Sequence, residues 1–183
     1  MPWRDGVLND VTMLIGTHTL LPVCLGLAAE NASLAKGRGH VFPPWGLLAI
    51  GFFGALPDLC TPHVSLDARY SSWSHTLWFM AAIIPVIAMV VSFFGKEGRW
   101  RLALGCWLAT LLHLIGDAVA GGIPWLQPWS PHILGDYYIP AADWLWYDIG
   151  FVLLTWILVR LRPFAEARGM GASVADSSAE TQA

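Results

Sequence analysis

The chain has 183 residues, of which 56% are hydrophobic and only 13% are charged. Soluble domains normally carry about 25% charged residues, so this composition predicts a protein that crosses a membrane several times. The net charge is −3 and no basic block is present, which leaves nucleic-acid binding without electrostatic support. The length suits one bundle of about five helices and is too short for two domains.

Five apolar segments follow one another along the chain. They cover residues 12–29, 45–56, 76–94, 102–120 and 144–161. The second is shorter than the ~20 residues that a span needs, so we expect it to tilt, to begin earlier or to cross only in part. The pattern predicts an all-α, polytopic membrane bundle over residues 1–162. Residues 163–183 are small and polar without periodicity, which predicts a disordered tail.

The placement of cations predicts an orientation. Lys and Arg gather in the connections 30–44 and 95–101 and near the C-terminal end, whereas the connection 121–143 has none. Cytoplasmic connections are enriched in Lys and Arg. Five spans with the N-terminus outside and the C-terminus in the cytoplasm agree with this distribution.

His113 and Asp117 are the most unusual residues of the chain, because they interrupt an otherwise apolar segment. Their spacing of four residues places them one turn apart on the same helix face. Ionisable groups in a membrane helix are costly and require a partner or an ion. Three residues of the same kinds, His18, Asp58 and His75, occur in or beside other segments. The predicted topology places all five in the outer third of the bundle.

These five residues predict a metal site. Three imidazoles and two carboxylates provide the nitrogen and oxygen donors that suit Zn²⁺, and also Mn²⁺ or Fe²⁺. Five ligands exceed what one catalytic zinc needs, so two ions remain possible. A bound metal activates water for attack on an ester or phosphoester, and Asp58 or Asp117 is a candidate catalytic base. We expect a lipid or lipid-like substrate, because a lipid reaches a site at that depth most easily.

Other interpretations of the same residues stay open. His18 alone could bond a backbone carbonyl, Asp58 could cap a turn, and His113 with Asp117 could form a hydrogen bond on a helix surface. Two other functional classes fit as well. One is a transporter or ion-binding protein that binds a cation or relays protons. The other is a non-catalytic scaffold whose polar residues join helices.

Further polar residues are candidates for supporting roles. His63 and His132 fall on the predicted outer side and could contact substrate or a second metal, whereas His40 falls on the opposite side and is excluded. Asp148 lies one turn into the last apolar segment and could support a ligand histidine from behind. The stretch 121–131 contains Gly, Pro and Trp, and predicts an interfacial loop or, alternatively, a lid over the site.

The sequence resembles a known family, the bacterial membrane-bound metal-dependent hydrolases of the YdjM-like group, over about residues 18–130. The resemblance rests on an early His18, Gly54-Ala55-Leu56-Pro57-Asp58, Ser74-His75-Thr76, His113-Leu114-Ile115-Gly116-Asp117, Gly122 and the following Pro-Trp-Ser stretch. The order of ligands is also similar to the zinc-dependent phospholipase C and single-strand nuclease superfamily. The resemblance implies metal-ligand roles for the five residues, a hydrolase activity and a location in the bacterial inner membrane.

Two positions depart from the pattern of this family. Cys60 stands where the family often has a second Asp, and residues 69–74 lack the usual His-Arg pair before the histidine motif. A second metal is therefore not implied. Arg69 becomes the candidate phosphate-binding residue.

Overall fold

The computed structural model describes residues 15–61, 69–136, 138–140 and 143–181. The elements are α1 (Ile15–Leu34), α2 (Gly46–Cys60), the 3₁₀ turn η1 (Trp73–His75), α4 (Leu77–Ser92), α5 (Arg99–Val119) and α6 (Trp144–Thr181). The described residues contain no β-strand, apart from an isolated bridge between Ile123 and Leu134. The predicted all-α fold with about five helices is confirmed.

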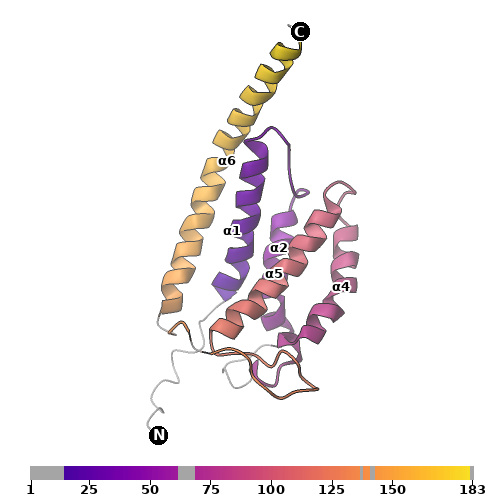
Figure 1. Cartoon of the computed structure of the whole chain (residues 1–183), viewed down its shortest axis with the longest axis vertical. Coiled ribbons are helices and arrows are strands. Elements are labelled where there is room, and N and C mark those ends of the chain that lie inside the picture. Colours follow the sequence, from indigo (N-terminus) through magenta and orange to yellow (C-terminus); the bar gives the residue numbers. More distant parts are fainter. Residues whose placement is uncertain (1–14, 62–68, 137, 141–142, 182–183) are drawn as a thin grey trace.

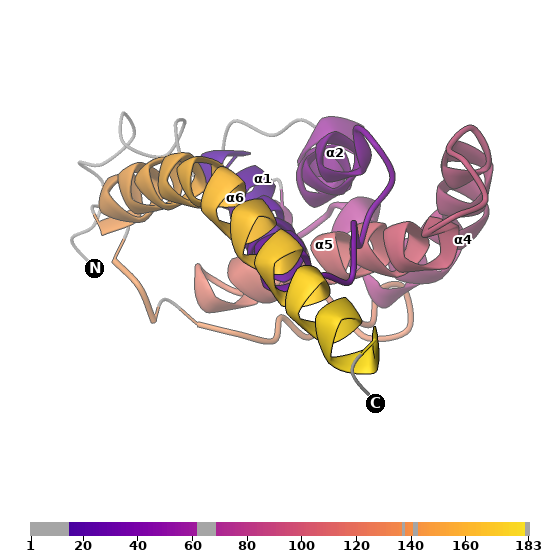
Figure 2. The same cartoon turned by 90° about the horizontal axis from the view of Figure 1, so that it is seen from above.

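Successive helices run in alternating directions (Figure 1). Helices α6 and α1 lie side by side at one edge, α2 and α5 form the middle, and α4 packs against α5 at the other edge (Figure 2). The main core lies between α2, α4 and α5, where Phe53, Ile83 and Cys106 are buried. The ends of α2 and α5 and the start of α4 therefore meet at one end of this core.

Two helices are long and apolar enough to cross a bilayer, namely α5 and the Trp144–Ala172 part of α6. Helices α2 and α4 are apolar but shorter, with 15 and 16 residues. The α6 stretch has only 6% of its residues buried, as expected for a helix that faces lipid. The number of spans stays a prediction.

Glycines let α1 approach its neighbours closely. A Cβ atom at Gly54 would collide with the carbonyl oxygen of His18 and lie 3.0 Å from Cγ of Pro22. A Cβ atom at Gly116 would lie 2.9 Å from Cε1 of His18. Small residues at helix contacts allow this kind of close packing in membranes. They fix the position of His18 between α2 and α5.

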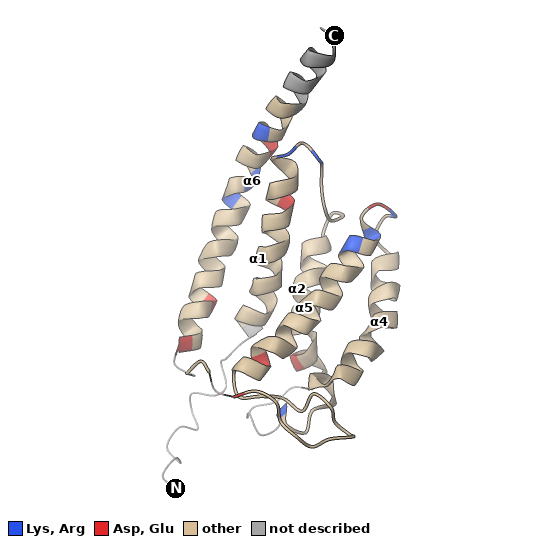
Figure 3. Ribbon diagram, in the orientation of Figure 1, with Lys and Arg blue, Asp and Glu red and all other residues tan. Residues whose placement is uncertain are grey.

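Charged residues separate between the two ends of the bundle. Figure 3 shows Lys and Arg gathered at the end where α1 ends and α5 begins, and carboxylates of α2 and α5 at the opposite end. This arrangement agrees with the grouping of cationic connections that the sequence predicts. The side of the membrane that each end faces stays a prediction.

Two helix ends differ from the sequence predictions. Helix α2 continues through Pro57 to Cys60, so Asp58 lies in the helix and does not cap a turn. Residues 163–183 were predicted to be disordered, but α6 continues through Pro163 to Thr181. Ala, Glu, Arg and Met residues between positions 164 and 172 favour helix. Tight packing of Gly169 on the end of α1, where a Cβ atom would collide with the carbonyl oxygen of Leu34, holds α6 there.

Candidate metal centre

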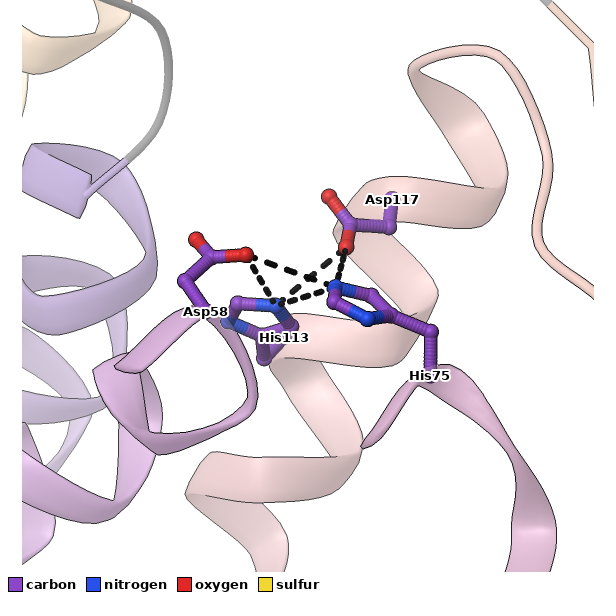
Figure 4. Close-up of side chains that lie close together, drawn as sticks. All are labelled: Asp58, His75, His113 and Asp117. Carbon is purple, nitrogen blue, oxygen red and sulfur yellow. Dashed lines mark hydrogen bonds and ion pairs between the residues drawn. The ribbon is translucent and has the colours of Figure 1, made fainter. Parts of the chain in front are cut away.

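Four side chains converge at one end of the core. Asp58 comes from α2, His75 from η1, and His113 and Asp117 from successive turns of α5 (Figure 4). One ligand atom from each lies within 4.8 Å of the others. The side chains of the two histidines are 0% exposed and that of Asp117 is 1% exposed, whereas that of Asp58 is 15% exposed. The group is buried and opens on the side of Asp58.

The spacing of these atoms matches a single metal ion. Nε2 of His75 lies 3.3 Å from Oδ1 of Asp58 and 2.9 Å from Oδ2 of Asp117. Nε2 of His113 lies 3.5 Å and 3.2 Å from the same two oxygens, and the two Nε2 atoms are 3.4 Å apart. Four donors at about 2.0–2.1 Å from a tetrahedral ion are about 3.3 Å from one another. The residues therefore fit a divalent ion.

Hydrogen bonds behind the two histidines direct their Nε2 atoms into the group. Nδ1 of His113 donates to the carbonyl oxygen of Gly54 at 2.7 Å, so its proton is on Nδ1 and the Nε2 lone pair faces the group. Nδ1 of His75 lies 3.0 Å from the Ser72 hydroxyl and 3.1 Å from the Ser74 hydroxyl. Ser74 donates to the carbonyl oxygen of Pro57, which leaves its oxygen to accept from His75. Metal-binding histidines are held in this way.

Asp117 lies at the centre of the group. Its Oδ2 faces both histidines, and its Oδ1 lies 3.2 Å from Nε2 of His18 and 3.2 Å from Nη2 of Arg69. Neither oxygen has a well-aligned hydrogen bond to the described residues. A buried carboxylate without such bonds is costly, and a cation bound at Oδ2 would stabilise it.

His18 lies beside the group of four. Its ring stacks on His113 with the centroids 3.9 Å apart, and its Nε2 faces the oxygen of Asp117 that points away from His75. The structure thus gathers four of the five predicted ligands into one donor set and places the fifth against Asp117.

Arg69 approaches the same carboxylate from the connection between α2 and η1. It is 3% exposed, and its Nε and Nη1 atoms have no hydrogen-bond partner among the described residues. A buried guanidinium group with two unused donors is ready to bind an anion.

Sequence reasoning missed the residues that hold the two histidines. Ser72 and Ser74 contact His75, and the Gly54 carbonyl contacts His113. The hydroxyl-rich stretch before His75 was the available signal for the first two. Thr76, the last residue of the Ser-His-Thr motif, has a different task, because its hydroxyl accepts from the Phe79 amide and caps α4.

The remaining candidates lie elsewhere. His132 is exposed and outside the group of four, and His63 lies outside the described residues. His40 is at the cationic end, 3.7 Å from Glu30, as its exclusion requires. Asp148 accepts a hydrogen bond from Thr17 and not from a histidine, because α6 packs on the side of α1 that carries Thr17.

The connection after α5 closes this end of the bundle (Figure 1). The Leu77 amide at the start of α4 donates to the Trp125 carbonyl oxygen at 2.9 Å, and the Tyr70 hydroxyl donates to the Gly121 carbonyl oxygen at 2.9 Å. The Trp129 ring packs on Trp78 with the centroids 4.2 Å apart. The predicted irregular loop is therefore tied to the elements that carry the site.

Comparison with known proteins gives one match. A family model described as YdjM inner membrane protein matches residues 13–175. No curated protein and no solved structure matches the chain. The chain belongs to the YdjM inner membrane protein family.

Proposed function

We propose that the protein is a membrane-embedded, metal-dependent hydrolase that cleaves a phosphoester of a lipid. The observation that carries this proposal is the convergence of Asp58, His75, His113 and Asp117 at the spacing of a tetrahedral ion. Two imidazole nitrogens and two carboxylate oxygens suit zinc, which is the ion we propose, with Mn²⁺ and Fe²⁺ as the other ions of matching chemistry. The relation to the zinc-dependent phospholipase C superfamily belongs to the same proposal.

One ion fits the charges of the site better than two. A second ion would have to lie beside His18 and Oδ1 of Asp117. The Arg69 guanidinium group is already 3.2 Å from that oxygen, and its charge would repel another cation. Arg69 thus supplies the second positive charge next to Asp117.

The two carboxylates have different tasks in this proposal. A bound divalent ion supplies a Lewis acid and lowers the pKa of water at the site. Asp58 has the more exposed side chain, so its carboxylate can accept a proton from attacking water. Asp117 is enclosed by His18, His75, His113 and Arg69, so it holds the ion and positions its neighbours.

The net charge of the site supports an anionic substrate. The two carboxylates balance a divalent ion, which leaves the charge of Arg69 uncompensated when the imidazoles are neutral. A phosphoester would contribute the missing negative charge, and its oxygens would accept from the unused Nε and Nη1 donors. A neutral carboxylic ester would leave the guanidinium group unpaired. Exposed Trp73, Trp78 and Trp129 at this end support a lipid as the substrate.

Hydrolysis by the purified protein tests the proposal. A phospholipid is offered, and released phosphorylated headgroup or diacylglycerol is measured separately from released fatty acid. We expect phosphoester cleavage, and a loss of about 10²–10⁴-fold in kcat for Asp58→Asn. Asp143→Asn, at an exposed residue, is the matched control. Fatty-acid release, or unchanged cleavage by Asp58→Asn, would contradict the assignment.

One observation favours a different class. His113 and Asp117 lie in α5, one of the two helices long and apolar enough to span a membrane, where transported ions or protons bind in many proteins. Liposomes that contain the purified protein test this alternative. Flux of Zn²⁺ or protons that Asp117→Asn abolishes, with no phosphoester cleavage, would replace the hydrolase proposal by a transporter.

A further inference from the structure

A second polar site lies at the opposite end of the bundle from the candidate metal centre. A cavity of about 370 Å³ is lined by Lys36, Arg38 and Arg101, with Ala29, Ala32 and Ser33 of α1 beside them. Its cations come from the connection after α1 and from the start of α5. Figure 3 shows the basic residues gathered at this end of the molecule.

The three cations around the cavity have no acidic partner among the described residues. The ion pairs at this end join His40 to Glu30 and Arg162 to Glu166, and no carboxylate lines the cavity. Arg101 lies over the Trp100 ring, which leaves its charge unneutralised.

Glu30 is the nearest acid, and it serves another purpose. It is 4% exposed, and its carboxylate accepts from the backbone amides of Val41 at 2.7 Å and Phe42 at 3.4 Å. It therefore fixes the chain that follows Arg38 and is not available to neutralise the cavity.

We propose that this cavity binds the phosphate group of an anionic membrane lipid. The chain belongs to an inner membrane protein family, and exposed Trp45 and Trp100 at the same end suit the level of lipid headgroups. Basic pockets between membrane helices bind such headgroups. Methyl groups of Ala29 and Ala32 beside the cations suit the glycerol that follows the phosphate.

The simplest alternative is that these cations only set the orientation in the membrane. In that case any basic residue at this end would contribute equally to binding. A site in the cavity instead requires Lys36, Arg38 and Arg101 in particular. Three other cations outside the cavity, Lys96, Arg160 and Arg168, allow a control that removes the same charge from the cationic part of the chain.

Lipid binding to the full-length protein in neutral detergent tests the proposal. Fluorescent phosphatidylglycerol is titrated against the wild type, the Lys36→Gln/Arg38→Gln/Arg101→Gln variant and the Lys96→Gln/Arg160→Gln/Arg168→Gln control. At about 1 kcal/mol for each cation, we expect binding to weaken on the order of 100-fold in the cavity variant and to change little in the control. Phosphatidylcholine should bind weakly to all three. Equal losses in both variants, or equal binding of the two lipids, would overturn the proposal.

A second titration identifies the source of the phosphate. Inorganic phosphate should displace the labelled lipid only at concentrations far above that of unlabelled phosphatidylglycerol. Displacement at equal concentrations would show a site for free phosphate and would contradict the lipid assignment. The binding should persist in His113→Ala, because the cavity and the metal centre are at opposite ends of the bundle.

Discussion

The Ser74 side chain shows how one residue can support a metal ligand. It donates to the Pro57 carbonyl oxygen and lies 3.1 Å from Nδ1 of His75. We predict that Ser74→Ala weakens metal binding by about 10- to 100-fold, because His75 loses part of its orientation. Competition with a coloured chelator measures this affinity. Ser92→Ala is the matched control, since Ser92 contacts the backbone at the far end of α4. Equal affinities in both variants would contradict the supporting role.

Arg69 tests the charge of the substrate. We predict that Arg69→Gln lowers kcat/KM for an anionic phosphoester by roughly 10- to 100-fold, because a hydrogen bond to a charged group contributes about 1.5–3 kcal/mol. The metal content should remain, since Arg69 lies outside the group of four donors. Steady-state kinetics with metal analysis check both points. Arg168→Gln should leave kcat/KM unchanged. An equal loss on a neutral ester would argue against anion recognition.

The candidate ligands could be found from the sequence because ionisable residues are costly in apolar segments. That argument identified His113, Asp117, Asp58 and His75, which the structure brings together. It could not reveal which donors hold the imidazoles. The bond from His113 to the Gly54 carbonyl depends on how α2 packs against α5, and a backbone carbonyl has no sequence signature.

At the scale of the helices, Gly54 controls the approach of α1 to α2. We predict that Gly54→Ala destabilises the protein by about 1–3 kcal/mol, because its methyl group would collide with the His18 backbone. Thermal unfolding in detergent measures the loss. Gly150→Ala is the matched control, since nothing lies within 4 Å of a Cβ atom there, and it should be neutral or stabilising. Equal unfolding temperatures for the two variants would show that the contact is unimportant.

Apolar segments predicted where the helices lie, but not where they end. Polarity suggested that order stops near residue 162, whereas α6 continues to Thr181. Helix propensity and the contact of Gly169 with α1 outweigh polarity at this end. Likewise, Pro57 suggested an end for α2 that the structure places at Cys60, so the helix delivers Asp58 to the metal centre.

For the whole molecule, the predicted orientation places the metal centre at the outer face. Cys60 is exposed at this end, whereas Cys24 and Cys106 are buried. We predict that a membrane-impermeant maleimide labels Cys60 in right-side-out vesicles. Cys60→Ala should abolish the label. Adding Lys96→Cys to that variant should restore labelling only after the vesicles are opened. Labelling of Lys96→Cys in sealed vesicles would mean the opposite orientation.

Metal content tests the central claim most directly. The protein is purified without an affinity tag that binds metal, and bound ions are counted for the wild type, His113→Ala and His40→Ala. His40 is exposed at the opposite end of the bundle and serves as the matched histidine. We predict about one divalent ion per chain in the wild type and His40→Ala, and almost none in His113→Ala. Equal and low metal content in all three proteins, after incubation with zinc, would contradict a metal centre.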